Sequence, residues 1–271
     1  MHTDVNELFS ALWTDYIQMT PSAAKVHELL GKGEDIINDH IALRTFNLPK
    51  VNLQVLAAHF EALGYKACGD YNFEAKKLNA KHYEHPDPTQ PKVFISELLV
   101  EEFSPELQDK VAFLVEQIDE QALTQKDFLY SGRHWKLDSE TYQALLAESE
   151  YAAWVAAIGY RANHFTVSVN HLPGYDSLQE VNLALKEGGF VLNTSGGEIK
   201  GSAEVLLEQS STMADQIEVA FEDTKLKIPS CFYEFALRYP KPDGELYTGF
   251  VAASADKIFE STNAVSGKQS A

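Results

Sequence analysis

Two histidines and one glutamate stand out because each lies in a segment that otherwise has the pattern of a β-strand. His40 opens the segment HIALRTFNLP, His164 opens HFTVSVNHLP, and Glu234 interrupts the apolar run CFYEFALRY. Two imidazoles and one carboxylate can hold a divalent metal ion and leave coordination positions open for a substrate or for dioxygen. Each residue alone is compatible with a half-buried polar group whose hydrogen bonds are satisfied. The three together predict a metal site.

Two arginines follow the candidate ligands at the same spacing. Alternate residues of a strand share a face, so His40 and Arg44 are expected to point to the same side, roughly 13 Å apart at ~3.3 Å per residue. A guanidinium can bind a carboxylate through two hydrogen bonds, so Arg44 is a candidate for holding a substrate carboxylate. The alternative is that Arg44 pairs with a structural acid. Arg238 lies equally far from Glu234, and a substrate contact and a structural ion pair remain equally open for it.

The segments around the two histidines form an internal repeat. At an offset of 124 residues (164 − 40) the histidines coincide, and so do the Leu-Pro pairs that follow them. A helical segment comes next in each half, VNLQVLAAHFEALGY and then GYDSLQEVNLALKEGGF, and ends at glycine. Strand-like runs follow: YKACGDY, KKLNAKHYEH and KVFISEL in the first half, and FVLNT, AEVLLEQSS, DQIEVAFED and IPSCFYEFALRY in the second. Each half is therefore predicted to fold as a βαβββ module.

The predicted fold class is α+β, with tandem βαβββ modules arranged as a half-barrel like that of the vicinal oxygen chelate superfold. Helical spacing of apolar residues in the first part of the chain, and again between the two halves, indicates N-terminal helices and a helical insert. We expect residues 1–271 to form a single compact domain. Its parts are N-terminal helices (1–34), a first module (35–102), a helical insert (103–160), a second module with a C-terminal segment (161–262) and a flexible tail (263–271).

Composition narrows the possible partners and location. The formal net charge of −18 repels phosphate backbones, so no nucleic acid is expected as a partner. No apolar run approaches the ~20 residues that span a bilayer, and the first residues lack the pattern of a secretion signal. We therefore expect a cytoplasmic protein without membrane contact. Cys68 and Cys231 are predicted to be reduced, buried thiols and not a disulfide.

Other polar residues are weaker candidates. His82 and His85 could ligate a metal, but residues three apart on a strand face opposite sides. Gln209 and the hydroxyl residues that follow it are expected to close a turn, with orientation of a substrate as the alternative. Phe232 or Tyr233, next to Glu234, is expected to help keep the metal pocket dry.

The sequence resembles the 2-oxoadipate dioxygenase/decarboxylase family, formerly a domain of unknown function, and is similar to its short forms. The resemblance lies in DHIALRTF, NHFTVSVN, GGEIKGSAEVLLEQSSTMAD, IPSCFYEFALRY and GFVAASADKIFEST, which span most of residues 35–262. It implies metal ligands at His40, His164 and Glu234 and a substrate-binding arginine at Arg44. It also implies an Fe(II) enzyme that uses dioxygen to convert 2-oxoadipate to 2-hydroxyglutarate in lysine breakdown.

Three function classes follow from these residues. The first is the Fe(II)-dependent dioxygenase and decarboxylase, whose partners would be a small 2-oxo acid and dioxygen; Zn, Ni or Mn are other metals that the site could hold. The second is a metal-dependent hydrolase or lyase on the same scaffold, which would need no dioxygen. The third is a module that binds a metal or ligand without catalysis. The oligomeric state does not follow from the sequence.

Overall fold

The computed structural model describes residues 1–33 and 35–263. Its first half contains one βαβββ module. The helix that follows its first strand begins after Asn52, whose side-chain oxygen accepts a hydrogen bond from the Val55 N–H. The elements of this module are β1 (Asn38–Phe46), α3 (Leu53–Glu61), β2 (Lys66–Phe73), β3 (Leu78–Glu84) and β4 (Lys92–Leu98).

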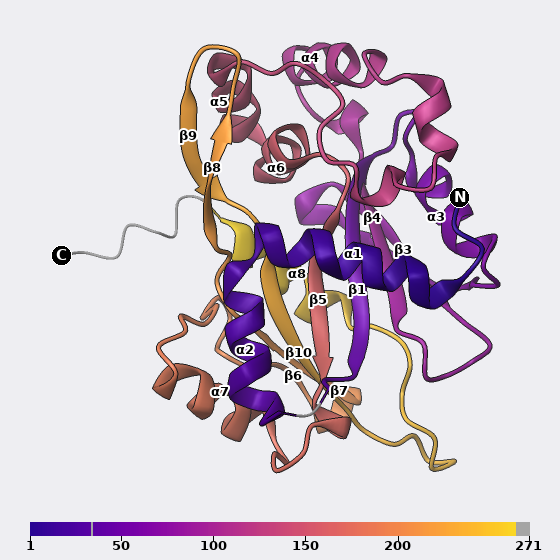
Figure 1. Ribbon diagram of the computed structural model, residues 1–271, viewed down its shortest axis with the longest axis vertical. Coiled ribbons are helices and arrows are strands. Elements are labelled where there is room, and N and C mark those ends of the chain that lie inside the picture. The colour runs from indigo at the N-terminus through magenta and orange to yellow at the C-terminus, as the bar shows by residue number, and fades with distance from the viewer. Residues whose placement is uncertain (34, 264–271) are drawn as a thin grey trace.

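The second half repeats this order with one addition. Its crossover helix is capped by the Ser177 hydroxyl, which accepts the Glu180 N–H. Two strands, β8 (Gln216–Ala220) and β9 (Lys225–Pro229), form a separate hairpin that projects from the sheet (Figure 1). The elements that match the first half are β5 (Ala162–Ser168), α7 (Leu178–Glu187), β6 (Lys200–Ser202), β7 (Leu207–Ser211) and β10 (Phe232–Arg238).

The two modules share one curled eight-stranded sheet with the order β2-β3-β4-β1-β5-β10-β7-β6. β1 and β5 are antiparallel neighbours at its centre, and each runs parallel to the last strand of its own module, β4 or β10. The sheet is therefore approximately twofold symmetric about the β1–β5 pair. The predicted α+β fold with paired βαβββ modules in a half-barrel is confirmed.

The predictions for two strands of the second half were wrong. Residues 190–194 form only one isolated bridge, Leu192 to Thr212, because the Asn193 carbonyl accepts a hydrogen bond from the Lys200 side chain and the Asn193 amide group donates to Lys257. The run IPSCFYEFALRY is divided between the projecting hairpin and the sheet. Ser230 lies at the division, where its N–H donates to the Asp215 carbonyl.

Helices cover the convex face of the sheet. α1 (Val5–Met19) crosses the central strands and α2 (Pro21–Gly31) follows it (Figure 1). Tyr16 of α1 packs on Phe165 of β5 with ring centroids 4.9 Å apart. Because neighbouring residues of a strand point to opposite faces, Phe165 on the convex side leaves His164 on the concave side.

The helical insert lies at one end of the sheet, at the top of Figure 1. Its helices are α4 (Pro105–Glu116), α5 (Ser139–Glu148) and α6 (Glu150–Ile158), and side chains of Ser104, Asp138 and Ser149 cap their first turns. All residues of α6 after the first are buried, which places the rings of Tyr151 and Trp154 beside the end of β1.

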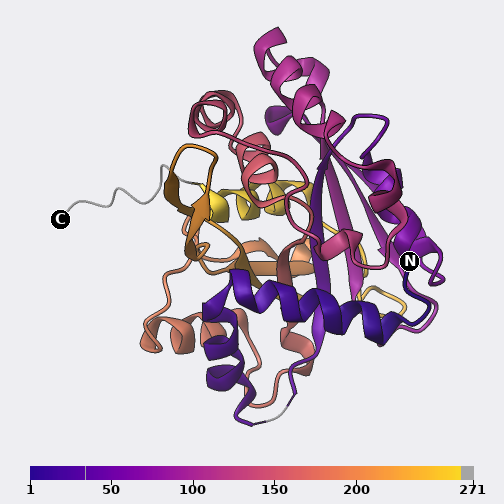
Figure 2. The same ribbon diagram turned by 45° about the horizontal axis from the view of Figure 1, so that its top comes forward.

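The C-terminal segment closes the concave face. α8 (Ala252–Ile258) continues into a single 3₁₀ turn, η7 (Phe259–Thr262), on the side of the sheet opposite to α1 (Figure 2). α8 contacts β2 at one edge of the sheet and β6 and β7 at the other. The predicted flexible tail lies outside the described residues except for Asn263.

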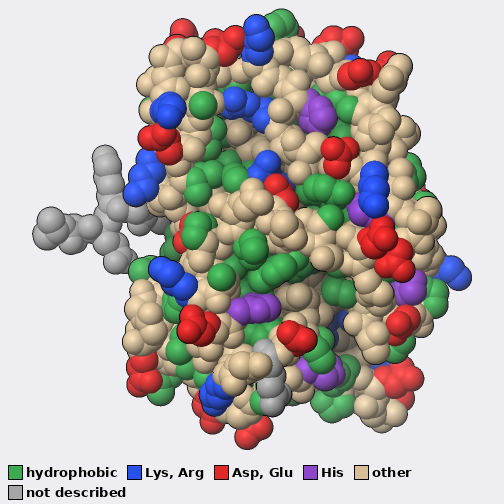
Figure 3. Space-filling view, in the orientation of Figure 1, with side chains coloured by type: hydrophobic (Ala, Val, Ile, Leu, Met, Phe, Trp, Pro, Cys, Tyr) green, Lys and Arg blue, Asp and Glu red, His purple; other side chains and the backbone are tan. Residues whose placement is uncertain are grey.

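Surface features complete this description. Lysine and arginine side chains are interspersed with acidic ones on the face shown in Figure 3. Among the helices of residues 1–33 and 35–263, none combines the length and the apolar character that a membrane span requires. Both cysteines are free thiols, and Cys231 is buried as predicted. Cys68 is exposed, contrary to the prediction, because it lies at an irregularity of the edge strand β2.

Candidate metal centre

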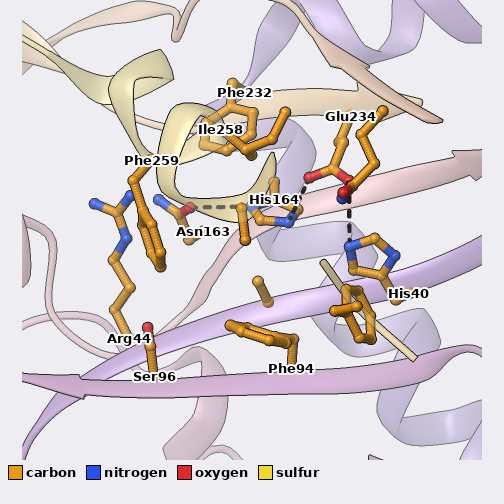
Figure 4. A pocket seen from close by; sticks show the side chains of 14 residues that line it. His40, Arg44, Phe94, Ser96, Asn163, His164, Phe232, Glu234, Ile258 and Phe259 are labelled. Atoms are coloured by element: carbon orange, nitrogen blue, oxygen red, sulfur yellow. Dashed lines mark hydrogen bonds and ion pairs between the residues drawn. The ribbon is translucent and has the colours of Figure 1, made fainter. Parts of the chain in front are cut away.

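His40, His164 and Glu234 converge on the concave face from three adjacent strands, β1, β5 and β10 (Figure 4). Thr166 of β5 is in register with His40 on one side and with Glu234 on the other, which brings these two side chains into one row across the sheet. His40 Nε2 lies 3.5 Å from Glu234 Oε1, and His164 Nε2 lies 3.1 Å from Glu234 Oε2. One ligand atom from each residue lies within 4.8 Å of the others.

The outer nitrogen of each histidine is held by the residue that precedes it. His40 Nδ1 lies 2.7 Å from an oxygen of Asp39, and His164 Nδ1 lies 3.1 Å from the side-chain oxygen of Asn163. Acceptors at Nδ1 favour the tautomer that leaves the Nε2 lone pair facing the centre. The sequence prediction missed both positioning residues. The signal was present in the repeat, since Asp39 and Asn163 are separated by the same 124 residues as the histidines (163 − 39).

Arg238 is part of this support and does not reach the pocket. Its Nε and one terminal nitrogen donate to the two oxygens of Asp39 at 2.6 and 2.9 Å, and its other terminal nitrogen donates to the backbone carbonyls of Tyr247 and Gly249. Burial alone would raise the pKa of Asp39, but Arg238 and His40 hold that pKa well below its usual value. Of the two alternatives for Arg238, these contacts match the structural ion pair.

The hydrogen bonding around His40 leaves a surplus of acceptors. A neutral imidazole carries one N–H, and the ionised Asp39 takes it at Nδ1. The lone pair of Nε2 then faces the Glu234 carboxylate, with the Thr166 hydroxyl 3.1 Å away as a donor to that nitrogen. A nitrogen lone pair and a carboxylate oxygen that face each other in a buried site repel each other, which is unfavourable unless a cation lies between them. This arrangement fits a bound divalent metal ion.

Gln209 completes the support, and its predicted position in a turn was wrong. It lies within β7, is buried, and donates from its amide nitrogen to Glu234 Oε1 at 2.6 Å. Burial alone would raise the pKa of Glu234, but the neighbouring His40 and His164 and the bond from Gln209 hold that pKa below its usual value. Glu234 is therefore ionised and has one oxygen fixed by a donor from the protein.

The cavity beside this centre has mostly apolar walls. Phe94 and Phe250 line it on one side and Phe232 on another, with the Phe232 ring centroid 4.6 Å from that of His164. Ala255, Ile258 and Phe259 of the C-terminal segment close it. Tyr233 faces the other side of the sheet, where its hydroxyl bonds to His27, so only Phe232 of the two predicted aromatic residues contributes to the dry wall.

Arg44 lies at the far end of the same cavity, on the face of β1 that carries His40 (Figure 4). Its side chain is 3% exposed, and its guanidinium carbon lies 5.0 to 5.4 Å from the ring centroids of Tyr151, Trp154 and Phe259. One terminal nitrogen donates to the Thr262 hydroxyl at 3.1 Å, and its Nε has no partner. Within the described residues no carboxylate lies within ion-pair distance of Arg44, but Glu150 at the start of α6 is near enough to interact with it electrostatically. The structural acid named as the alternative partner of Arg44 therefore corresponds to Glu150.

A second group, Cys68, His82 and Glu84, also has ligand atoms within 4.8 Å of one another. Here the hydrogen bonds are already satisfied. His82 Nε2 donates to Glu84 at 2.9 Å, and its Nδ1 bonds to the Tyr71 hydroxyl at 2.8 Å. His85 points elsewhere, to the Leu63 carbonyl, so the weaker candidate pair of His82 and His85 does not converge.

Comparison with known proteins agrees with this geometry. The family model of the 2-oxoadipate dioxygenase/decarboxylases matches residues 3–245. The chain belongs to this family. A relative in Arabidopsis thaliana, named 2-oxoadipate dioxygenase/decarboxylase, chloroplastic, is 35% identical over 283 residues, which cover 92% of this chain and 75% of the plant protein.

Two solved structures are similar to this member of the 2-oxoadipate dioxygenase/decarboxylase family. The hydroxyglutarate synthase of Oryza sativa, solved in complex with 2-oxoadipate, is 33% identical with a TM-score of 0.88, over 96% of this chain and 93% of the rice chain. A protein of Shewanella frigidimarina NCIMB 400, named a putative hydrolase, is 71% identical with a TM-score of 0.91, over 93% of this chain and all of the other.

Proposed function

We propose that this protein is an Fe(II)-dependent dioxygenase and decarboxylase of a small 2-oxo dicarboxylic acid, with 2-oxoadipate as the substrate. The observation that carries the proposal is that the two ends of one buried cavity carry different chemical groups. One end carries three converging metal donors, and the other is lined by Arg44, whose Nε has no hydrogen-bond partner. A molecule with a metal-chelating 2-oxo acid group at one end and a free carboxylate at the other matches both. The rice relative, with 2-oxoadipate in its complex, supports this substrate.

In this proposal His40, His164 and Glu234 hold the metal. Bound there, Fe(II) supplies two functions, chelation of the 2-oxo acid group and activation of dioxygen. Asp39 and Asn163 fix the ligand tautomers, and Gln209 fixes one oxygen of Glu234, so the ligands keep their directions as substrate arrives.

The rest of the cavity orients the substrate and keeps water out. Arg44 takes the distal carboxylate, which sets the position of the carbon chain relative to the metal. The rings of Phe94, Phe232 and Phe250 surround the reacting end, where they exclude water that would otherwise divert a reactive oxidant. The reaction balances as 2-oxoadipate plus dioxygen giving 2-hydroxyglutarate plus carbon dioxide.

The second candidate is a metal-dependent hydrolase or lyase. The name of the Shewanella relative, putative hydrolase, favours this candidate, and the same donors could hold a metal that activates water. Such an enzyme would turn over its substrate without dioxygen.

The two are separated by loading metal-free protein with Fe(II) under anaerobic conditions and then testing 2-oxo acids with an oxygen electrode. The proposal predicts oxygen uptake with 2-oxoadipate and its loss in Glu234→Gln. A matched control is Glu97→Gln, because Glu97 is a partly buried carboxylate on β4 that accepts the Leu53 N–H outside the cavity. Substrate conversion without oxygen uptake would instead support the hydrolase or lyase.

A further inference from the structure

A surface cleft lies directly behind Arg44. Lys76, Lys77 and Phe103 form one side of it, and Ser149 and Glu150 at the start of α6 form the other. Two further residues, Arg44 and Phe259, line both this cleft and the metal cavity. The two spaces are therefore separated by these two side chains.

Phe259 is the partition between them. In Figure 4 its ring stands between the Arg44 guanidinium and His164, and the ring centroid lies 5.4 Å from the Arg44 guanidinium carbon. The ring belongs to η7, a single turn that is held from the cleft side by the ion pair between Lys76 and Glu260. In this position the ring covers one face of the guanidinium and narrows the path between the cleft and the metal cavity.

The cleft has the chemistry to receive an anion on a strongly acidic protein. Lys76 and Lys77 carry positive charge on one side of it, and Ser149 joins the end of α5 to the start of α6 on the other. Arg44, almost wholly buried and with its Nε unpartnered, lies at its base. Two acids also line the cleft: Glu148 accepts hydrogen bonds from Ser104, and Glu150 has a pKa that burial raises and the interaction with Arg44 lowers.

We propose that this cleft is the entrance through which the dicarboxylate substrate reaches the metal cavity, with Phe259 as the side chain that moves aside. The inference rests on the proposed function for the identity of the substrate. Entry from this side gives the correct orientation in one pass. The 2-oxo acid end passes Arg44 and meets the metal, and the trailing carboxylate stops at the guanidinium.

The test blocks the cleft from outside. Ala75 is exposed on the 3₁₀ turn Glu74–Lys76 (η1) and lines the cleft, so Ala75→Cys in a Cys68→Ser background can carry a bulky, reducible thiol label. The matched control is the wild-type chain labelled at its native Cys68, which is exposed and lies outside both spaces, whereas Cys231 is buried. Iron content, kcat/KM for 2-oxoadipate and the anaerobic association rate constant are measured before labelling, after labelling and after reduction.

The association rate constant is followed by tryptophan fluorescence, because Trp154 lies beside Arg44. The entrance predicts that the label at position 75 lowers both this constant and kcat/KM by about tenfold or more, reversibly and without loss of iron. The label at Cys68 should change neither. Equal association rates for labelled and unlabelled Ala75→Cys would overturn the entrance. Failure of the proposed function gives a different result, in which 2-oxoadipate binds but the unlabelled protein consumes no oxygen.

Variants of the partition give a second, independent measurement. Phe259→Ala removes the ring and should raise the association rate constant about threefold or more, whereas Phe259→Trp should lower it. A stability defect would not mimic this pair, because both variants disturb the same packing but are expected to shift the rate in opposite directions. Association rates unchanged in both variants would show that substrate does not pass Phe259.

Discussion

Replacing Arg44 with methionine should separate recognition of the distal carboxylate from binding of the metal. Methionine keeps an apolar stem among the rings of Tyr151, Trp154 and Phe259 but removes the charge. A hydrogen bond to a charged group contributes about 1.5 to 3 kcal/mol, and two are lost from a site that is 3% exposed. Part of this is offset because the free enzyme no longer buries an unpaired guanidinium. The expected net loss in transition-state binding is about 2 to 4 kcal/mol, or roughly 30- to 900-fold in kcat/KM.

The assay compares two substrates on one enzyme by oxygen uptake. 2-Oxoadipate carries the distal carboxylate, and 2-oxohexanoate has the same chain length without it. Arg44→Met should lose the full factor on 2-oxoadipate but under ~1 kcal/mol on 2-oxohexanoate, which never makes the contact. Arg44→Lys should recover only part of the loss, because an ammonium keeps the charge but not the planar pair of donors.

Two controls accompany this comparison. Iron content should match the wild type, because Arg44 contacts none of the three candidate ligands. The free energy of unfolding of metal-free Arg44→Met measures the structural part of the role of Arg44, because the variant removes a buried charge together with its electrostatic interaction with Glu150. Equal losses on both substrates, or loss of bound iron, would show that Arg44 serves the fold or the metal and not the substrate.

Three further perturbations test the support around the centre. Gln209→Met removes the donor to Glu234 and should weaken metal binding about 10- to 100-fold, measured by competition with a chelator. Asp39→Asn leaves Arg238 buried without its partner and should lower the free energy of unfolding by about 3 to 5 kcal/mol in urea melts of the metal-free protein. Because the folded pKa of Asp39 lies below its unfolded value of about 3.9, this stabilisation is complete above that value and is lost as the pH falls from there through the folded pKa; the variant should lack that fall. Burial lowers the pKa of Lys200 in the folded protein to about 8, below the value of about 10.4 in the unfolded chain. Protonation of Lys200 therefore destabilises the fold: the penalty is absent above about pH 10.4 and develops as the pH falls through 8. The unfolding free energy of the wild type relative to Lys200→Met should therefore rise between pH 7 and pH 10.5.

The repeat made the fold and the convergence of the three candidate ligands predictable. A shared offset of His40 and His164 implies equivalent strands, and approximate twofold symmetry brings equivalent central strands together. Glu234 followed from its isolation in an apolar run, since a lone carboxylate in a buried strand needs a cation or donors nearby. The roles of these residues as ligands stay predictions until a metal is measured.

What the sequence could not provide is the direction of side chains whose partners are far away in the chain. Arg238 follows Glu234 at the same spacing at which Arg44 follows His40. Its side chain nevertheless bonds to Asp39, 199 residues earlier, and nothing in the sequence around Arg238 indicates this partner. Gln209 lies in a polar run that resembles a turn, and only pairing with β10 shows that the run is a buried strand beside Glu234. The partition at Phe259 likewise depends on where the C-terminal segment folds back onto the sheet.

The central claim is that this protein joins oxygen consumption to decarboxylation of a 2-oxo acid, and its most direct test is the stoichiometry of one reaction. Fe(II)-loaded protein is supplied with 2-oxoadipate and ¹⁸O₂, and dioxygen consumed, carbon dioxide released and product formed are measured together. The account predicts equal amounts of all three, with one heavy oxygen in the new carboxylate of 2-hydroxyglutarate and one in its hydroxyl group. Product formed without dioxygen, or without release of carbon dioxide, would contradict it.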